Sequence, residues 1–160
     1  KAALDFAEFS GNENVYDLYS GASTISNYIS EYVKQVYGFE SVNSAIDDAR
    51  SNCLANNIKN VKPYEVDLNK SFLPFIEKRR IPIPDVVIAD PPRAGMNPKT
   101  VKDILQVLPE KIVYVSCNPS TQARDIKTLC EEEYKLVKIQ PVDMFPQTYH
   151  IENVALLKRK

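Results

Sequence analysis

The chain has 160 residues, with 20 Lys and Arg against 21 Asp and Glu, and a formal net charge of −1. The length suits one domain, and the composition is that of a globular protein. No apolar run approaches the roughly 20 residues that span a membrane, and residues 1–10 lack a signal-peptide core, so we expect a cytoplasmic protein or a piece of one. The charge argues against an autonomous RNA binder, because neutralising phosphates requires a basic excess.

Strand-like and helix-like segments alternate along the chain. The predicted strands are Val15 to Leu18, Gln35 to Glu40, Val61 to Glu65, Asp85 to Asp90, Lys111 to Ser116, Tyr134 to Pro141 and Asn153 to Lys158. The predicted helices are Thr24 to Lys34, Asn43 to Asn56, Lys70 to Arg79, Thr100 to Leu108 and Pro119 to Glu133. This alternation predicts an α/β fold with a mostly parallel seven-stranded sheet and helices on both faces. The last two strands have no helix between them, which predicts one antiparallel member at the edge.

The cysteines do not form a metal-binding pattern. Cys53, Cys117 and Cys130 are far apart in sequence, and His150 is the only histidine. A zinc or iron–sulfur site needs about four clustered ligands, so we predict no metal in this chain. One reactive thiol remains possible.

Acids at successive strand ends indicate a nucleoside site, because ligands of such sheets bind at the carboxyl ends of the strands. Asp17 lies near the end of the first strand, and Tyr19 and Gly21 lie in the turn that follows it. Glu40 ends the second strand and is placed to accept hydrogen bonds from ribose hydroxyls. Asp67 follows the third strand and is placed to meet an adenine amino group. A tight loop without a ligand and solvated surface acids are the alternatives.

Two later strand ends carry residues suited to chemistry. Asp90 precedes Pro91 and Pro92, which stiffen the loop and fix the direction of its carboxylate. Cys117 follows a buried strand, directly before a helix that Pro119 is placed to begin. The positive end of that helix favours a thiolate. The alternatives are a rigid turn with a capping aspartate and a buried structural cysteine.

The segment from Asp143 to Glu152 is a polar and aromatic loop between the last two strands. Loops of this kind often contribute to function. Glu152 is a candidate general base if it faces the cysteine. For His150 the residues alone favour a loop histidine whose hydrogen bonds are satisfied.

These motifs resemble those of the RNA uracil-5-methyltransferases, a family of class I, Rossmann-like, S-adenosylmethionine-dependent enzymes. The resemblance runs from about Val15 to Leu157. It rests on Asp17-Leu18-Tyr19-Ser20-Gly21, Asp90-Pro91-Pro92-Arg93-Ala94-Gly95, Ser116-Cys117-Asn118-Pro119-Ser120-Thr121 with Ala123-Arg124-Asp125, and Asp143-Met144-Phe145-Pro146 with Thr148, His150 and Glu152.

The resemblance implies methylation of uridine carbon 5 in tRNA or rRNA through a covalent adduct. Cys117 would add to carbon 6, Glu152 would remove the carbon 5 proton, and Asp90 would face the uracil edge. It also implies a set of substrate contacts: Arg93, Asn118, Phe145 and His150. The cofactor contacts it implies are Asp17, Tyr19, Gly21, Glu40, Asp67 and Asp90.

The sequence departs from the family pattern in two places. Ser23 stands where a second glycine of the cofactor loop is usual. The upstream part of family members is also absent, so we expect a catalytic domain excised from a longer protein, with RNA held mainly by other regions. A non-covalent amino-group methyltransferase and an inactive nucleoside- or RNA-binding module are the alternatives. A nicotinamide dehydrogenase is disfavoured by the glycine pattern.

Overall fold

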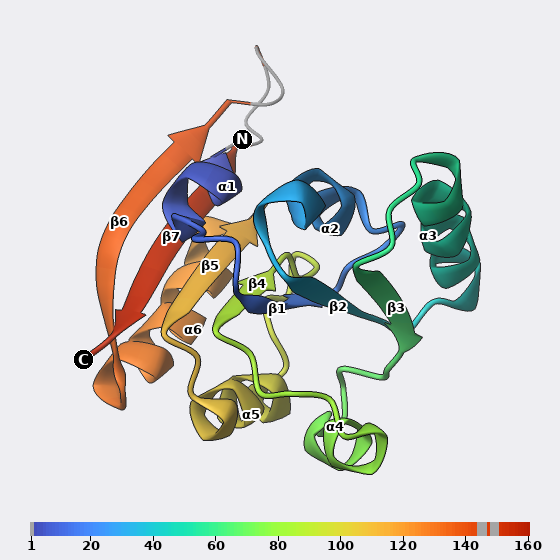
Figure 1. The fold of residues 1–160 in the computed structure, drawn as a ribbon. Coiled ribbons are helices and arrows are strands. Elements are labelled where there is room, and N and C mark those ends of the chain that lie inside the picture. The colour runs from blue at the N-terminus through green and yellow to red at the C-terminus, as the bar shows by residue number, and fades with distance from the viewer. Residues whose placement is uncertain (1, 144–146, 148–150) are drawn as a thin grey trace.

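The computed structural model describes residues 2–143, 147 and 151–160, and its centre is a seven-stranded sheet (Figure 1). The strands are β1 (Asn14–Leu18), β2 (Gln35–Glu40), β3 (Val61–Glu65), β4 (Val86–Ala89), β5 (Lys111–Ser116), β6 (Tyr134–Val142) and β7 (Glu152–Arg159). The helices are α1 (Ala2–Ala7), α2 (Thr24–Ile29), α3 (Asn43–Ala55), α4 (Leu73–Arg79), α5 (Pro98–Val107) and α6 (Pro119–Glu131), with a 3₁₀ turn, η1 (Ser30–Tyr32), after α2. None of the helices in these ranges is long and apolar enough to cross a membrane.

The strand order is β3-β2-β1-β4-β5-β7-β6. All neighbours are parallel except β7, which runs antiparallel to both β5 and β6. The predicted mostly parallel sheet with an antiparallel last strand is therefore confirmed. The expectation that the antiparallel strand lies at the edge is wrong, because β7 is inserted between β5 and β6. Residues 153–157 are buried on both faces of the sheet, whereas β6 is exposed along most of its length.

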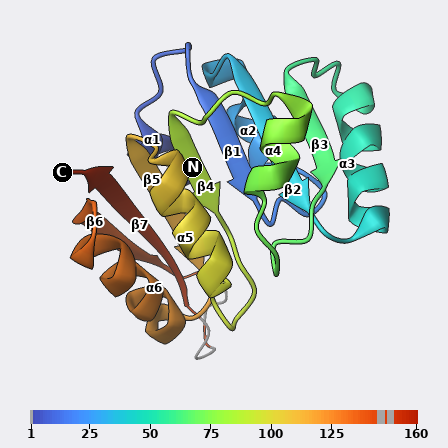
Figure 2. The same cartoon turned by 90° about the horizontal axis from the view of Figure 1, so that it is seen from below.

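Helices cover both faces of the sheet, as predicted. α1, α2 and α3 lie on one face, and α4, α5 and α6 lie on the other (Figures 1 and 2). Side chains alternate between the two layers along each strand. Val86 and Ile88 of β4 join the core under α1–α3, whereas Val87 and Ala89 join the core over α4–α6. Burial on both faces explains the nearly continuous apolar runs of these strands.

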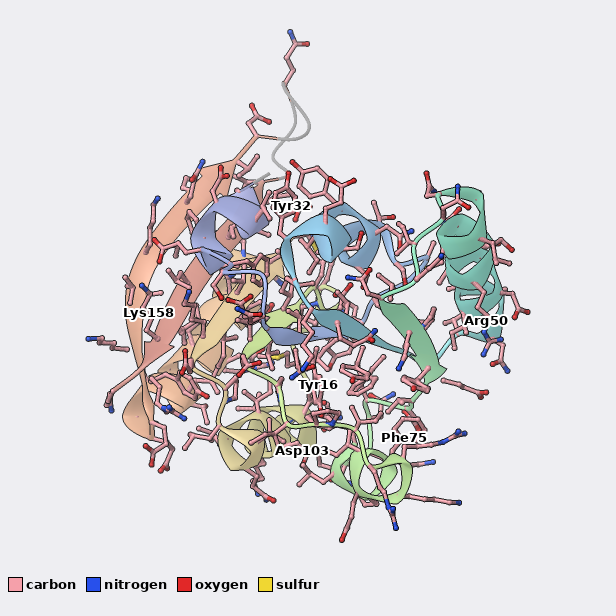
Figure 3. The ribbon with its side chains drawn as sticks, viewed as in Figure 1. Tyr16, Tyr32, Arg50, Phe75, Asp103 and Lys158 are labelled. Carbon is pink, nitrogen blue, oxygen red and sulfur yellow. The ribbon has the colours of Figure 1, made fainter. Side chains whose placement is uncertain are left out.

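An aromatic cluster packs the ends of β1 and β2 against α4. The rings of Tyr16 and Phe39 lie 5.0 Å apart, and Phe39 lies 5.8 Å from Phe72 and 6.1 Å from Phe75. Tyr16 and Phe75 lie in the layer between the sheet and α4 (Figure 3). These contacts fix the strand ends from which the candidate site is built.

Helix α1 was not predicted, because its six residues form less than two turns and bury only Phe6 and Ala7. Tertiary contacts hold it in place instead of intrinsic helix propensity. Lys111 Nζ on β5 donates to the carbonyl oxygens of Ala7 at 2.6 Å and Glu8 at 3.2 Å. A cation at this position also complements the negative end of the helix. The helix is thereby fixed beside β5 and β7.

Candidate active site

The strand register brings the predicted site residues to one edge of the sheet. Leu18 at the end of β1 pairs with Phe39 of β2 and Ala89 of β4, so the residues that follow these strands are level with one another. Because β7 is antiparallel, its first residue lies at the same edge as the last residue of β5. The final pair, Ser116 with Asn153, leaves the next residue outward on each strand, Cys117 and Glu152, at this edge.

One cavity contains all three predicted catalytic residues. It has a volume of about 660 Å³, and Asp90, Cys117 and Glu152 line it together with apolar side chains. Its walls also include Ala2, Ala3 and Leu4 of α1, residues from α2, and valines of β5, β6 and β7. The polar groups therefore converge in a largely apolar pocket, which is the usual form of a small-molecule or base-binding site.

Cys117 sits in a tight turn between β5 and α6. The Ser116 hydroxyl accepts from Asn118 N at 3.0 Å and donates to Asn118 O at 3.1 Å. The Asn118 side chain caps α6 by accepting from Ser120 N at 3.1 Å, and Pro119 occupies the first turn. These bonds hold the half-buried thiol of Cys117 at the helix start. The predicted location of Cys117, directly before a helix, matches this geometry.

Asp90 has a perturbed carboxyl group. Asp90 keeps part of its surface accessible at the cavity wall, but the protein around its carboxyl group displaces some of the water that would solvate the charge, so the group is partly buried. This burial, followed by the negative charge of Glu152, raises the pKa of Asp90 to about 6. Acids whose pKa is raised by burial and by a second carboxylate are common where proton transfer occurs.

The turn after β1 has a strained backbone. Gly21 has φ 51°, but Tyr19 and Ser23 also have positive φ angles of 64° and 61°. The value at Ser23 explains why glycine suits that position, since left-handed backbone costs a residue with a side chain about 1–2 kcal/mol. Gly38 on β2 makes room for the turn, because a Cβ there would lie 2.9 Å from Ser20 Oγ. Gly38 was not singled out from the sequence.

Three buried oxygens without a hydrogen-bond partner occur in the described part of the chain, and all belong to this turn and its strand. They are Asp17 Oδ1, Ser20 Oγ and Ser23 Oγ. An unpaired buried polar atom is costly and calls for an explanation. A polar ligand in the turn would supply the partners that the protein itself does not.

The acids on the neighbouring strands are already oriented. Glu40 Oε2 accepts from Gly21 N at 3.0 Å, and its Oε1 accepts from Ser41 N at 2.7 Å and Val42 N at 2.9 Å. Asp67 accepts from Asn69 N at 3.0 Å and forms an ion pair with Lys70; the Asn69 N–H lowers the pKa of Asp67. Glu40 is thus fixed against the glycine turn, while Asp67 lies in the partly exposed turn after β3.

Asp17 is the most strongly perturbed acid near the turn. The residue is 1% exposed, and its Oδ2 accepts from the Ser26 hydroxyl at 2.5 Å. Burial raises the pKa of Asp17 to about 7, and the negative charges of Asp90 and Glu40 contribute to the rise. Since Asp17 keeps its proton in the fold up to about pH 7 and loses it near pH 4 when unfolded, it lowers stability as the pH rises through that window.

We predict that Asp17→Asn raises the free energy of unfolding at pH 8 by about 2 kcal/mol. The amide keeps the shape of the acid and its acceptor for Ser26, but it carries no charge to desolvate. Denaturant unfolding of both proteins between pH 4 and pH 8 measures the effect, and the gain should shrink towards pH 4. Asp47→Asn, on the exposed face of α3, is the control and should change little. Equal stability of the Asp17→Asn variant and the wild type at pH 8 would contradict the argument.

The four residues predicted to contact the substrate differ in what the structure shows of them. Arg93 is exposed next to the cavity loop. The Asn118 amide is used within the protein, since its Nδ2 donates to Arg93 O at 3.0 Å and its Oδ1 caps α6. Phe145 and His150 lie outside the described residues. Contact of these four residues with a substrate stays a prediction.

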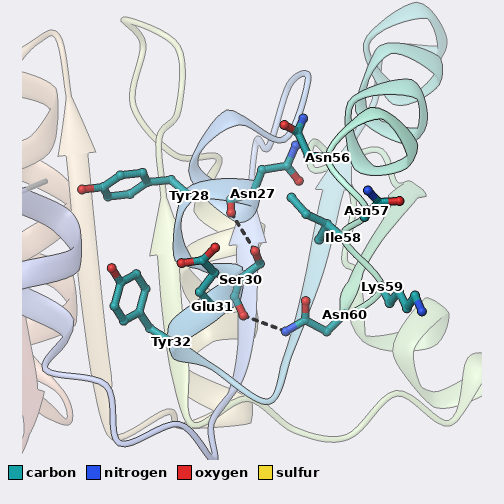
Figure 4. A pocket seen from close by; sticks show the side chains of 10 residues that line it. All are labelled: Asn27, Tyr28, Ser30, Glu31, Tyr32, Asn56, Asn57, Ile58, Lys59 and Asn60. Atoms are coloured by element: carbon teal, nitrogen blue, oxygen red, sulfur yellow. Dashed lines mark hydrogen bonds between the residues drawn. The ribbon is translucent and has the colours of Figure 1, made fainter.

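A second pocket of about 560 Å³ lies at the opposite, amino-terminal edge of β2 and β3. Figure 4 shows its polar lining, in which Asn60 Nδ2 donates to Ser30 O at 2.8 Å. Of the predicted site residues, none lines it. Elsewhere in the described ranges, no group of three His, Cys, Asp or Glu side chains could hold a metal ion. The cavity with Cys117 is therefore the candidate active site.

A mostly parallel sheet with this strand order, an antiparallel β7 and helices on both faces is the fold of the Rossmann-like methyltransferases. The family model described as tRNA (Uracil-5-)-methyltransferase matches residues 2–160, and the chain belongs to this family. A protein of Bacteroides thetaiotaomicron described as an uncharacterized RNA methyltransferase is 50% identical over 159 residues, covering 99% of this chain and 34% of the relative. A Porphyromonas gingivalis protein with the same description is 50% identical over 162 residues, and the match covers 99% of this chain and 34% of that relative.

A solved structure agrees with this assignment. The Pyrococcus abyssi tRNA (uracil-54, C5)-methyltransferase, crystallised in complex with S-adenosyl-L-homocysteine, superimposes with a TM-score of 0.82 at 37% identity. The match covers 98% of this chain and 36% of that one. The chain thus spans about a third of the length of the curated relatives it matches.

Proposed function

We propose that this chain is a catalytic domain that transfers a methyl group to carbon 5 of a uridine in tRNA or rRNA. The observation that carries the proposal is the convergence of Cys117, Glu152 and Asp90 in one cavity. Membership of the uracil-5-methyltransferase family gives this convergence its chemical meaning.

Cys117 is the nucleophile of the proposed reaction. Carbon 5 of uracil is a weak nucleophile, so a covalent step is needed to activate it. The Cys117 thiolate forms a bond to carbon 6, and the electrons of the carbon 5–carbon 6 double bond move towards carbon 5 and the neighbouring carbonyl. Carbon 5 is then ready to take a methyl group.

Glu152 completes the reaction as general base. Its carboxylate takes the proton from methylated carbon 5, the double bond re-forms, and the sulfur–carbon 6 bond breaks to release Cys117. Asp90 faces the same cavity and, with its raised pKa, is a candidate hydrogen-bond partner for the uracil edge. The uridine must leave any base stack to enter the cavity.

The strand-end acids fit S-adenosylmethionine. Asp17 near the end of β1 and the turn with Tyr19 and Gly21 contain the buried oxygens that lack partners. Glu40 is hydrogen-bonded to this turn, and Asp67 follows β3 at the same edge of the sheet. Glu40 would accept hydrogen bonds from the ribose hydroxyls, and Asp67 would accept one from the adenine amino group. Asp17, in the strand before the turn, would stabilise the turn. S-adenosylmethionine, when bound, supplies the methyl group as an electrophilic sulfonium. The Tyr19 ring is the exception, since its hydroxyl accepts from Asn97 N at 3.4 Å, and its backbone N donates to Phe39 O at 2.9 Å.

RNA is the proposed partner, and we propose that residues outside these 160 make most of the contacts that bind it. The net charge of −1 supports this division, because a domain that held RNA alone would carry a basic excess. The share of the curated relatives that lies outside the match is about two thirds of their length.

The test is a covalent trap in the protein that naturally contains this chain. RNA with 5-fluorouridine at candidate sites is incubated with S-adenosylmethionine, and fluorine cannot leave as the proton does. We expect a complex that survives a denaturing gel, with the RNA attached to Cys117 by peptide mapping. Methylation of ordinary RNA without any trapped complex would instead indicate a non-covalent transferase. Neither methylation nor trapping across tRNA and rRNA would favour an inactive binding module.

A further inference from the structure

The loop between β4 and α5 carries Asp90 and is fastened to α6. Arg93 O accepts from Asn118 Nδ2 at 3.0 Å and from Thr121 Oγ1 at 3.1 Å. Asn118, which follows Cys117, is the N-cap of α6, and Thr121 lies in the first turn of that helix. Two loops that line the candidate active site are therefore attached to the start of one helix.

A second set of bonds fastens the far half of the same loop. Arg124 donates from Nε and Nη2 to Asp125 Oδ1 at 2.9 and 2.8 Å, and from Nη2 to Ala94 O at 3.0 Å. Asp125 Oδ2 accepts from Met96 N at 2.8 Å and from the Tyr114 hydroxyl at 2.7 Å. Asp125 is 4% exposed, so each of these partners compensates for the desolvation of its charge.

Gly95 lets the loop backbone lie directly on this pair. Its φ is +81°, and a Cβ at this position would lie 2.7 Å from both Arg124 Nη2 and Asp125 Oδ2. Such an approach leaves no room for a side chain. The loop is thus in close contact with Arg124 and Asp125, which limits how far it can move.

We propose that Arg124 and Asp125 are positioning residues that hold the Asp90 loop in register with the Cys117 loop. The inference rests on the proposed function, because register between the two loops matters only if Asp90 and Cys117 act on the same base. Neither Arg124 nor Asp125 lines the cavity. They act through the loop, and a displacement of about 1 Å in such a site can cost up to a hundredfold in rate.

The test is Arg124→Gln, which removes the two bonds to Asp125 Oδ1 and the bond to Ala94 O. Arg124 is half exposed, with 56% of its side-chain surface accessible, so the variant should fold. We expect kcat for RNA methylation to fall about tenfold, with KM for RNA changed less than about twofold. Lys127→Gln is the matched control, because Lys127 lies one turn on along α6 in an exposed ion pair with Glu131. It should leave kcat unchanged.

A second readout separates positioning from simple stabilisation. The carboxyl titration of Asp90, followed by ¹³C NMR in the 160-residue chain, should begin near 6 and move down towards its usual value in Arg124→Gln. Among the described residues, the charged groups coupled to Asp90 are Glu152 on β7 and Asp17 on β1, and both are present in the variant. Loss of the Arg124 charge alone would raise the pKa of Asp90, so a downward shift reports displacement of the loop. Arg124→Lys keeps the positive charge but not the planar guanidinium with its several N–H donors. We expect its Asp90 pKa and its kcat to lie between those of the wild type and those of Arg124→Gln.

Two results would overturn the inference. One is a lower melting temperature in Arg124→Gln with an unchanged Asp90 titration. The other is a shifted titration with an unchanged kcat in a protein that methylates RNA. The titration needs neither RNA nor cofactor, so failure of the proposed function would show separately, as absent methylation in the wild type.

Discussion

Cys117→Ala should abolish methylation of ordinary RNA and the trapped complex with 5-fluorouridine RNA. Without a sulfur to add to carbon 6, carbon 5 remains the weak nucleophile of free uracil. We expect turnover to fall by about 10⁴-fold or more, since removal of a covalent nucleophile commonly has effects of this size. Cys117→Ser should behave similarly, because a hydroxyl is far less ionised than a thiol. Methyl transfer from labelled S-adenosylmethionine measures the loss.

The matched control is Cys130→Ala. Cys130 is half buried at the end of α6 and lies outside the lining of the candidate active site. It should retain full turnover and trapping, which would show that loss of a thiol does not by itself impair the protein. Retained turnover in Cys117→Ala would refute the covalent mechanism and leave a non-covalent transfer.

Much of the fold was predictable because four of the parallel strands, β1, β2, β4 and β5, are largely buried on both faces. The ranges predicted for β2, β3 and β5 agree with the structure residue for residue. The position of β7 was harder to predict. When two strands have no helix between them, either one can lie beside β5 and leave the other at the edge of the sheet. A signal existed: Val154 to Leu157 form a continuous apolar run, as expected of an interior strand. In β6 the apolar residues are interrupted by Lys135, Lys138 and Gln140, and most of the strand is exposed.

Some helix limits depended on tertiary contacts that the local sequence does not contain. The helix predicted from Thr24 to Lys34 gives way to η1 after Ile29, where Asn60 Nδ2 binds the carbonyl oxygens of Ser30 and Val33. α4 begins at Leu73 instead of Lys70. There the buried carboxylate of Asp103 accepts from Ser71 Oγ and Phe72 N, which holds the preceding turn out of the helix.

The site was predictable where chemistry and strand ends coincide, and less so elsewhere. Cys117, Glu152 and Asp90 are unusual residues at strand ends, so their convergence followed from the topology. The wall formed by α1 was not predicted, because apolar residues such as Leu4 carry no chemical signal. Asn118 has a chemical signal, but its observed contacts are the cap of α6 and Arg93 O. A polar side chain beside a nucleophile can therefore serve the loop as well as the substrate.

Glu152→Gln should accumulate a covalent protein–RNA complex on a denaturing gel, whereas Cys117→Ala should show none. Glutamine keeps the size of the side chain but cannot take the carbon 5 proton, so the methylated base stays bonded to Cys117. We expect ordinary RNA to form a persistent protein–RNA complex that contains the transferred methyl group. Turnover should fall by about 10²–10⁴-fold, the range for loss of a general base. Labelled methyl in the shifted band measures this outcome directly.

The alternative base is Asp90, which is the only other carboxylate among the described residues that line the cavity. Full turnover in Glu152→Gln would refute the assignment and make Asp90→Asn the next variant to trap. Glu110→Gln, at the opposite edge of the sheet before β5, is the control and should release its product normally. A complex that accumulates only in Glu152→Gln would place proton removal after methyl transfer, since the trapped base would already carry the methyl group. Cys117 and Glu152 would then act in sequence on the same base, as their positions on the adjacent antiparallel strands β5 and β7 allow.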